Sequence, residues 1–136
     1  MTPPKNHLAA NLDGVRHWTP AVAEAIARAS IPDGFTTCAG TDGTFTYCRI
    51  LETANGGARR LEWLGGTSMP AASAGALIHS LDAGVINGLG LGIGSGYEWK
   101  AFAAKLAGAQ AVFVFDDRIR YVRMALELCD LTQELS

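Results

Sequence analysis

The spacing of apolar side chains separates the chain into two subregions, residues 1–66 and 67–136. Residues 35–64 alternate between apolar and polar side chains and are interrupted by Asp-Gly and Asn-Gly-Gly turns, a pattern typical of an antiparallel meander. Elsewhere the apolar side chains recur at helical spacing or form short continuous runs. In chain order, the predicted elements are helices at 11–18 and 20–30, strands at 35–39, 44–52 and 59–64, a helix at 70–81, a strand from 85, a helix at 97–107, a strand at 111–115 and a helix at 119–129.

Residue types at the helix ends predict the caps, and the spacing of apolar residues predicts which side chains are buried. Thr19 is expected to cap the second helix, because a threonine hydroxyl can accept from the free amides at a helix start. Pro20 suits the first helical position, since its φ angle is already helical. Gly108 is expected at the carboxyl-terminal cap of the helix that begins at Tyr97. The side chains expected to face a core from the helices are Val22, Ile26, Leu77, Ile78, Leu81, Trp99, Phe102, Ala103, Leu106, Val122, Ala125, Leu126 and Cys129.

The stretch from Val85 to Asp117 carries the most information about function. It reads as an apolar strand, a glycine-rich turn, an amphipathic helix and a second apolar strand that ends in acid. That order is the layout of a Rossmann-like βαβ unit. We therefore predict an α/β fold in which a small antiparallel meander with helices leads into a Rossmann-like βαβ unit. Residues 1–136 are expected to form a single compact domain.

The glycine turn is the predicted ligand site. Glycine permits positive φ and lets a ligand approach the backbone, and the following helix directs its free N–H groups and its dipole at that place. An acid at the end of the next strand commonly accepts hydrogen bonds from ribose hydroxyls. The predicted cofactor-binding residues are Gly90, Gly92, Gly94, Ser95, Gly96 and Asp116.

Two stricter motifs do not fit this turn, and two readings of it stay open. The strict G-x-G-x-x-G pattern fails in every register, and the Gly-Lys-Ser/Thr of a phosphate-binding loop is missing. The spacing is closer to the G-x-G-x-G loop of S-adenosylmethionine-dependent methyltransferases, which it resembles. The glycines are also explained by a tight strand-to-helix turn without any ligand. Glu98, in the first turn of the helix, suits the helix dipole but repels a phosphate, which favours either a neutral or cationic ligand such as S-adenosylmethionine or no ligand at all.

The composition and charge of the chain limit the classes of partner and the compartment that we expect. The chain has 136 residues, 49% of them hydrophobic and 18% charged, which fits one folded domain. Its net charge of −2 includes no basic run, so nucleic acid is not the expected partner. No apolar run is long enough for a membrane span, and the protein is expected to be cytoplasmic. Cys38, Cys48 and Cys129 are then most simply small buried side chains, with a cross-strand disulfide between the first two as the less favoured alternative.

A metal site is not predicted. Asp116 and Asp117 resemble the metal-binding acid pair of nucleotide-sugar transferases, but the glycine turn precedes their strand at Rossmann spacing, which favours a ribose-binding or capping role for Asp116. The three histidines show no metal-ligand spacing with the cysteines. The catalytic residues are unknown, and enzyme activity in this chain alone is not expected.

Several features together resemble one family. They are Asn11-Leu12 in a leading helix, the Asp42-Gly43 turn of the meander, the turn from Gly90 to Tyr97, and the helix containing Arg123 to Leu126. This order is similar to the N-terminal region of bacterial motility-associated-factor and related glycosyltransferase-like proteins. In that family a longer downstream region carries the transferase fold, and the strand-end motif is Glu-Pro-Asp instead of Asp116-Asp117-Arg118.

The resemblance implies a noncatalytic or incomplete N-terminal module of a larger protein, which binds a nucleotide or nucleotide-sugar at the glycine turn. The first alternative is a cofactor-binding fragment that resembles a methyltransferase and takes S-adenosylmethionine. The second alternative is a ligand-free interaction or dimerisation domain. The expected partners are a nucleotide-like small molecule and either a second copy of the chain or a downstream catalytic domain.

Overall fold

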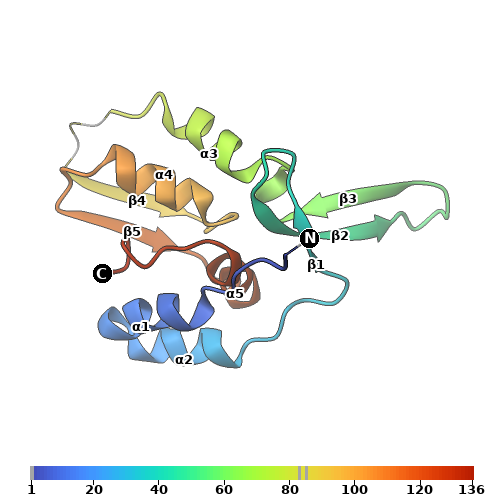
Figure 1. Ribbon diagram of the computed structural model, residues 1–136, viewed down its shortest axis with the longest axis horizontal. Helices are drawn as coiled ribbons and strands as arrows, with labels where there is room; N and C mark the ends of the chain where they lie inside the picture. Colours follow the sequence, from blue (N-terminus) through green and yellow to red (C-terminus); the bar gives the residue numbers. More distant parts are fainter. Residues whose placement is uncertain (1, 83, 85) are drawn as a thin grey trace.

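The computed structural model describes residues 2–82, 84 and 86–136 (Figure 1). Within them the fold is mixed α/β, as predicted, with a three-stranded antiparallel sheet and a two-stranded parallel sheet. The elements are α1 (Leu8–Trp18), α2 (Pro20–Arg28), β1 (Thr36–Ala39), β2 (Phe45–Glu52), β3 (Arg59–Trp63), the 3-10 turn η1 (Leu64–Gly66), α3 (Pro70–Ile78), β4 (Asn87–Leu91), α4 (Tyr97–Lys105), β5 (Ala111–Phe115) and α5 (Ile119–Leu128).

The meander has the strand order β1-β2-β3, and its first turn also organises α3. The Asp42 carboxylate accepts hydrogen bonds from Thr44 on one oxygen and from the backbone amides of Ala71 and Ala72, in the first turn of α3, on the other. An acid at this place satisfies amides that have no partner within the helix. The Asp-Gly turn therefore does two things: it reverses the chain and it holds the start of α3.

The second sheet is the predicted βαβ unit, in which β4 and β5 run parallel with α4 between them in the chain. Gly88 and Gly90 turn toward α4: a Cβ at Gly88 would lie 2.6 Å from the Phe102 ring, and one at Gly90 would overlap the Trp99 ring. Glycine at these positions lets two large aromatic side chains lie directly on the strand. Figure 1 shows α4 along β4 as a consequence.

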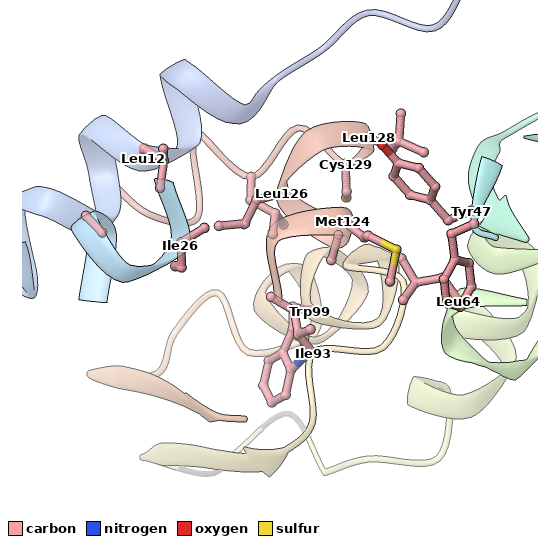
Figure 2. Close-up of a cluster of buried hydrophobic side chains, with 14 residues drawn as sticks. Leu12, Ile26, Tyr47, Leu64, Ile93, Trp99, Met124, Leu126, Leu128 and Cys129 are labelled. Atoms are coloured by element: carbon pink, nitrogen blue, oxygen red, sulfur yellow. The ribbon is translucent and has the colours of Figure 1, made fainter. Parts of the chain in front are cut away.

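Helix α5 lies at the centre of the hydrophobic core (Figure 2). Met124 and Ala125 are fully buried, and Leu126 nearly so. Side chains reach α5 from both subregions, including Leu12 and Ile26 from the first two helices, Tyr47 and Leu64 from the meander, and Ile93 and Trp99 from the βαβ unit. One core therefore joins the two parts that the sequence pattern distinguishes.

A buried amide fixes the carboxyl end of α5. Asn11 is completely buried, and its side-chain nitrogen donates to the carbonyls of Leu126 and Cys129, each at 2.8 Å. Its side-chain oxygen accepts from the backbone amide of Leu131 at 3.0 Å. The last carbonyls of a helix have no partner within the helix, so an external donor is required wherever they are buried. Asn11 supplies that donor from α1.

A charged network ties α5 to the meander and to α2. The hydroxyl of Tyr47 donates to Glu127, whose other carboxylate oxygen accepts from Arg123 at 3.0 Å. Arg123 also donates to the Ala27 carbonyl at 2.8 Å. Burial, and then the Glu127 carboxylate, raise the pKa of the Tyr47 phenol, so Tyr47 stays a donor at physiological pH.

Several local predictions are wrong, and tertiary packing explains why. The Thr19 hydroxyl lies 3.3 Å from the Val15 carbonyl, to which it donates, and makes no cap for α2. Ile26 is buried as predicted, but Val22 and Leu77 are 45% and 65% exposed, because Ala23 completes the buried face of α2 and Pro70 and Ala74 form that of α3. Leu81, expected in the same helix, lies beyond its end at Ile78 and is 37% exposed. Gly108 is not the cap of α4, which ends at Lys105 with Leu106 as its cap residue. The predicted strand residue Val85 lies outside the described residues.

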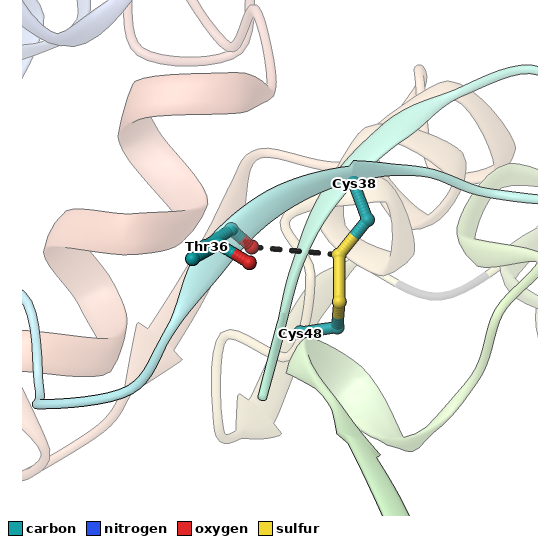
Figure 3. Close-up of a disulfide and its surroundings, with 3 residues drawn as sticks. All are labelled: Thr36, Cys38 and Cys48. Atoms are coloured by element: carbon teal, nitrogen blue, oxygen red, sulfur yellow. Dashed lines mark hydrogen bonds between the residues drawn. A yellow bond between two sulfur atoms is a disulfide. The ribbon is translucent and has the colours of Figure 1, made fainter. Parts of the chain in front are cut away.

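The structure also corrects the reading of the cysteines. Cys38 and Cys48 form a disulfide between β1 and β2, with their Cα atoms 6.3 Å apart (Figure 3). Thr46 lies opposite Cys38, so the bond joins residues in a diagonal relation across the two strands. The Thr36 carbonyl approaches Cys38 Sγ at 3.4 Å, as a contact only, because a disulfide sulfur carries no proton. The meander pattern predicted that the two cysteines lie on neighbouring strands. It did not determine the register between those strands, which decides whether the two sulfur atoms meet.

The disulfide bears on localisation. Disulfides persist in oxidising compartments and are rare in the cytosol, so this bond weighs against the cytoplasmic prediction. Across the part of the chain that the structure describes, no helix combines the length and the apolar composition needed to cross a bilayer.

We expect Asn11→Ala to lower the free energy of unfolding by about 2–4 kcal/mol, because two carbonyls and one amide lose their buried partner. Chemical denaturation by urea, followed by far-UV circular dichroism, measures this value. Asn55→Ala, in the exposed turn between β2 and β3, is the matched control and is expected to change stability by less than about 0.5 kcal/mol. Equal effects of the two substitutions would contradict the anchoring role of Asn11.

Alkylation under denaturing conditions checks the disulfide. Without reductant the chain is expected to take up iodoacetamide at Cys129 only, and after reduction at all three cysteines, as read by mass spectrometry. A double substitution of Cys38 and Cys48 by serine is expected to cost about 2–3 kcal/mol, because a loop of this length no longer constrains the unfolded chain. Uptake of three alkyl groups before reduction would show that the bond does not form.

Candidate functional site

The turn between β4 and α4 depends on glycine at alternate positions. Gly92, Gly94 and Gly96 have φ values of 84°, 57° and 89°, which side chains with a Cβ rarely adopt. The Gly92 amide donates to the Phe115 carbonyl at 2.7 Å, which continues the pairing of β4 with β5 for one more residue. The turn therefore begins at the end of a hydrogen-bonded ladder, and its backbone geometry is determined by these three residues.

The Asp116 carboxylate holds the turn from the next strand. One oxygen accepts from the backbone amide of Ile93 at 2.9 Å, and the other accepts from the backbone amide of Arg118 at 2.9 Å. The Arg118 guanidinium donates to both oxygens, at 3.1 and 3.0 Å. The Asp116 side chain is only 3% exposed, while that of Arg118 is 55% exposed. Arg118 thus covers Asp116 from the solvent side.

These contacts change the titration of both groups. Burial by itself raises the pKa of Asp116, but the hydrogen bonds from Arg118 and from the Ile93 amide outweigh it, and the net effect is a lowered pKa. The hydrogen bond to Asp116 raises the pKa of Arg118. The pair is therefore charged on both sides at neutral pH.

A second carboxylate occupies the amino end of α4. Glu98 accepts hydrogen bonds from the backbone amide of Ser95 at 2.9 Å and from the Ser95 hydroxyl at 2.7 Å, through the same oxygen. A Cβ at Gly94 would lie 2.8 Å from the Glu98 carboxyl carbon. The place where a bound phosphate would meet the helix dipole thus already holds a negative charge.

The turn packs against Trp99 of α4 and against the end of α5. Trp99 is 9% exposed and donates from its indole nitrogen to the Gly92 carbonyl at 2.8 Å. Gly96 lies against α5, where a Cβ would come within 2.8 Å of the Cys129 Cβ. The turn is thus held between α4 and α5, and only its outer side faces a cavity.

Two neighbouring cavities meet at Gly94 and Arg118. The first, of about 340 Å³, is lined by Leu77, Ile78, Gly90, Leu91, Gly92, Gly94, Glu98, Trp99, Phe102 and Arg118. The second, of about 500 Å³, lies toward the meander and is lined by Arg60, Leu61, Glu62, Trp63, Leu64, Gly65, Gly66, Gly94, Arg118 and Tyr121. The first has apolar walls with one acidic and one basic side chain, and its size suits a small organic ligand.

Three of the six predicted site residues line the first cavity and three do not. Gly90, Gly92 and Gly94 line the first cavity, although Gly90 belongs to β4 and not to the turn. Ser95 and Gly96 are buried, and the Ser95 hydroxyl is directed to Glu98. Asp116 is engaged by Arg118, and its carboxylate reaches a ligand only if the arginine moves aside.

Sequence reasoning missed the part that four residues play at this site. Arg118 was not singled out. An aspartate side chain commonly accepts a hydrogen bond from the backbone amide two residues later, and this local bond brings Arg118 next to Asp116. Glu98 was assigned to the helix dipole, whereas Ser95-x-x-Glu98 has the spacing of a capping box, in which the glutamate bonds the backbone amide of the serine. Glu98 makes that bond to the Ser95 amide, although Ser95 precedes the N-cap residue Gly96 and its hydroxyl bonds Glu98 instead of a backbone amide. The contribution of Leu77 and Ile78 from α3 carries no local signal, because it depends on how α3 packs beside α4.

Other reactive side chains add no catalytic group here. Burial raises the pKa of the Cys129 thiol to about 12, so Cys129 is an unreactive core residue at neutral pH. Among the residues that the structure describes, no group of three or more His, Cys, Asp or Glu side chains is placed to hold a metal ion.

Comparisons with known proteins do not assign a family. No protein-family model matches the sequence, and the searches of curated proteins and of solved structures also gave no match.

We expect Asp116→Asn to reduce stability at pH 7 by about 1–3 kcal/mol, because the ion pair with Arg118 and part of the hydrogen bonding are lost. The lowered pKa means that the Asp116 carboxylate stabilises the fold above its ordinary value of 3.8, and that this contribution disappears as the pH falls through the folded-state pKa. The variant should therefore lose less stability than the wild type between about pH 5 and pH 2.

Urea unfolding at a series of pH values makes this comparison. Asp117→Asn, next in the chain and exposed, is the control and should follow the wild-type curve to within about 0.5 kcal/mol at pH 7. An acid limb that is identical in the wild type and in Asp116→Asn would contradict the role assigned to this carboxylate.

Proposed function

We propose that the chain is a noncatalytic or incomplete module that binds a nucleoside-like small molecule in the cavity beside the glycine turn. The ligand class we favour is S-adenosylmethionine or a relative of it, that is, a nucleoside that carries an ammonium and a carboxylate. The resemblance to the leading region of glycosyltransferase-like proteins, with a nucleotide-sugar as ligand, is the second candidate.

The position of Glu98 is the observation that carries this preference. Its carboxylate already bonds the Ser95 amide at the amino end of α4, so a diphosphate would bring a second strong negative charge to the same place. An ammonium group would instead be attracted to Glu98. The same cavity contains Arg118, a partner for a carboxylate, and apolar side chains that suit a base or a thioether.

Binding would change the contacts of Arg118. Its side chain is more than half exposed and its partner Asp116 also accepts from the Ile93 amide, so the guanidinium can turn to a ligand without leaving Asp116 unpartnered. The freed oxygen of Asp116 would then accept from ribose hydroxyls, the role that the sequence predicted. In this proposal Arg118 covers the site when it is empty and binds the ligand when it is occupied.

A thermal-shift titration separates the two ligand classes. We expect S-adenosylhomocysteine at millimolar concentration to raise the melting temperature, because a ligand that binds only the folded state stabilises it by mass action. UDP, with and without Mn²⁺, is expected to give no shift. A shift with UDP alone would replace the proposal by the nucleotide-sugar reading, and no shift with either would overturn the proposed site.

Two variants test the assigned contacts. Glu98→Gln keeps an oxygen that can accept from Ser95 but removes the charge, and is expected to weaken S-adenosylhomocysteine binding about tenfold or more. Arg118→Gln is expected to do the same through the ligand carboxylate. Asp117→Asn, which does not line the cavity, is the matched control and should bind as the wild type does. Wild-type affinity in both Glu98→Gln and Arg118→Gln would place the ligand elsewhere.

A further inference from the structure

The two faces of the β4–β5 sheet differ in what covers them. On one face, α4 lies along the strands (Figure 1). Its Trp99 and Phe102 rings fill the space left by Gly90 and Gly88. The other face presents four large apolar side chains, which we call the bare face: Leu89 and Leu91 from β4, and Phe113 and Phe115 from β5. Their exposed fractions are 71%, 81%, 58% and 64%.

The bare face is a regular surface and not a scatter of exposed residues. Side chains two apart in a strand share a face, and the parallel register places Leu89 beside Phe113 and Leu91 beside Phe115. Two rows result, one of leucine and one of phenylalanine, with no charged side chain in either. Parallel strands are normally covered on both faces, so this surface is the kind that a partner covers.

Its size suits a symmetric interface. Side chains of this size bury roughly 150–250 Å² each, so their exposed fractions correspond to a patch on the order of 500 Å². Two such patches in contact would remove about 1,000 Å² from water, which is the lower limit for a specific interface, before any contact at the rim is counted. The net charge of −2 is too small to oppose association strongly.

We propose that the bare face is the interface of a homodimer, in which the β4–β5 sheets of two copies pack face to face. A twofold axis parallel to the strands lays the leucine row of one copy on the phenylalanine row of the other, so Leu91 meets Phe115 and Leu89 meets Phe113. Smaller side chains then interdigitate with larger ones at both rows, in the aligned arrangement that packed sheets adopt. Twofold dimers are also the commonest symmetric assembly.

The dimer does not depend on the proposed small-molecule site. The first cavity is lined by Trp99 and Phe102 on the α4 side of the sheet, and of the four bare-face residues it includes Leu91, whereas Leu89, Phe113 and Phe115 do not line it. Loss of association in Phe115→Glu, which lies outside the cavity lining, is therefore a separate result from loss of ligand binding.

Sedimentation equilibrium over about 1–200 µM protein tests the assembly without any ligand. The wild type is expected to approach twice its chain mass of 14.3 kDa. Phe115→Glu and Leu91→Lys are each expected to weaken association at least about 100-fold, because a charge would be buried in an apolar contact. Both side chains are exposed in the single chain, so circular dichroism and the melting temperature should show that the variants fold.

Mixing the two variants tests the symmetry. Because Leu91 of one copy faces Phe115 of the other, the Leu91→Lys chain and the Phe115→Glu chain are expected to form a heterodimer, with one lysine–glutamate pair in place of an apolar contact. Ile50→Lys is the matched control: Ile50 is 60% exposed on β2, outside the bare face, and this variant should dimerise as the wild type does.

Three results would overturn the proposal. They are a monomeric wild type at 200 µM, a folded Phe115→Glu variant that still dimerises like the wild type, and dissociation caused by Ile50→Lys. A mixture that fails to give a heterodimer would overturn the twofold arrangement, since that arrangement requires the lysine and the glutamate to meet.

Discussion

The structure depends on the satisfaction of buried polar groups around α5. This helix lies among the first two helices, the meander and the glycine turn, so its carboxyl end cannot be hydrated. The Asn11 side chain bonds that end from 115 or more residues away in the chain, and Glu127 bonds Tyr47 of the meander. Because an unpartnered buried carbonyl or carboxylate costs as much as a good packing contact contributes, these bonds determine which elements can meet on α5.

The glycine turn shows how a common loop acquires its own chemistry. Its backbone requires glycine at three positions, but its surroundings come from carboxylates that the chain itself supplies. Glu98 bonds the turn from α4, and Asp116 bonds it from β5. Both charges disfavour a phosphate in the usual place, and Arg118 is the group left to attract an anion. Our proposal for the ligand class therefore rests on which side chains cover the turn, and not on the spacing of the glycines.

The two faces of the parallel sheet carry side chains of opposite size. Glycine on one side brings α4 close enough for its aromatic rings to touch the strand backbone. On the other side, leucine and phenylalanine stand in two rows with little around them. A two-stranded parallel sheet gains little stability from its own hydrogen bonds, so the covering of its faces largely decides its stability. The α4 side is covered within the chain, and the bare face is the surface for which we propose a second copy of the chain as the cover.

The sequence by itself determined the elements and the fold class, because the period of apolar residues and the turn residues are local properties. The meander, the βαβ order and the position of the glycine turn are examples. Only the tertiary structure decided what these elements do. The register of β1 on β2 brought Cys38 to Cys48, the packing of α3 left Leu77 exposed, and the approach of Arg118 closed Asp116. Some of these outcomes depend on contacts between side chains that are distant in sequence, and others depend on the rotamer that a side chain adopts. Long-range contacts and rotamers leave no periodic signal in the sequence.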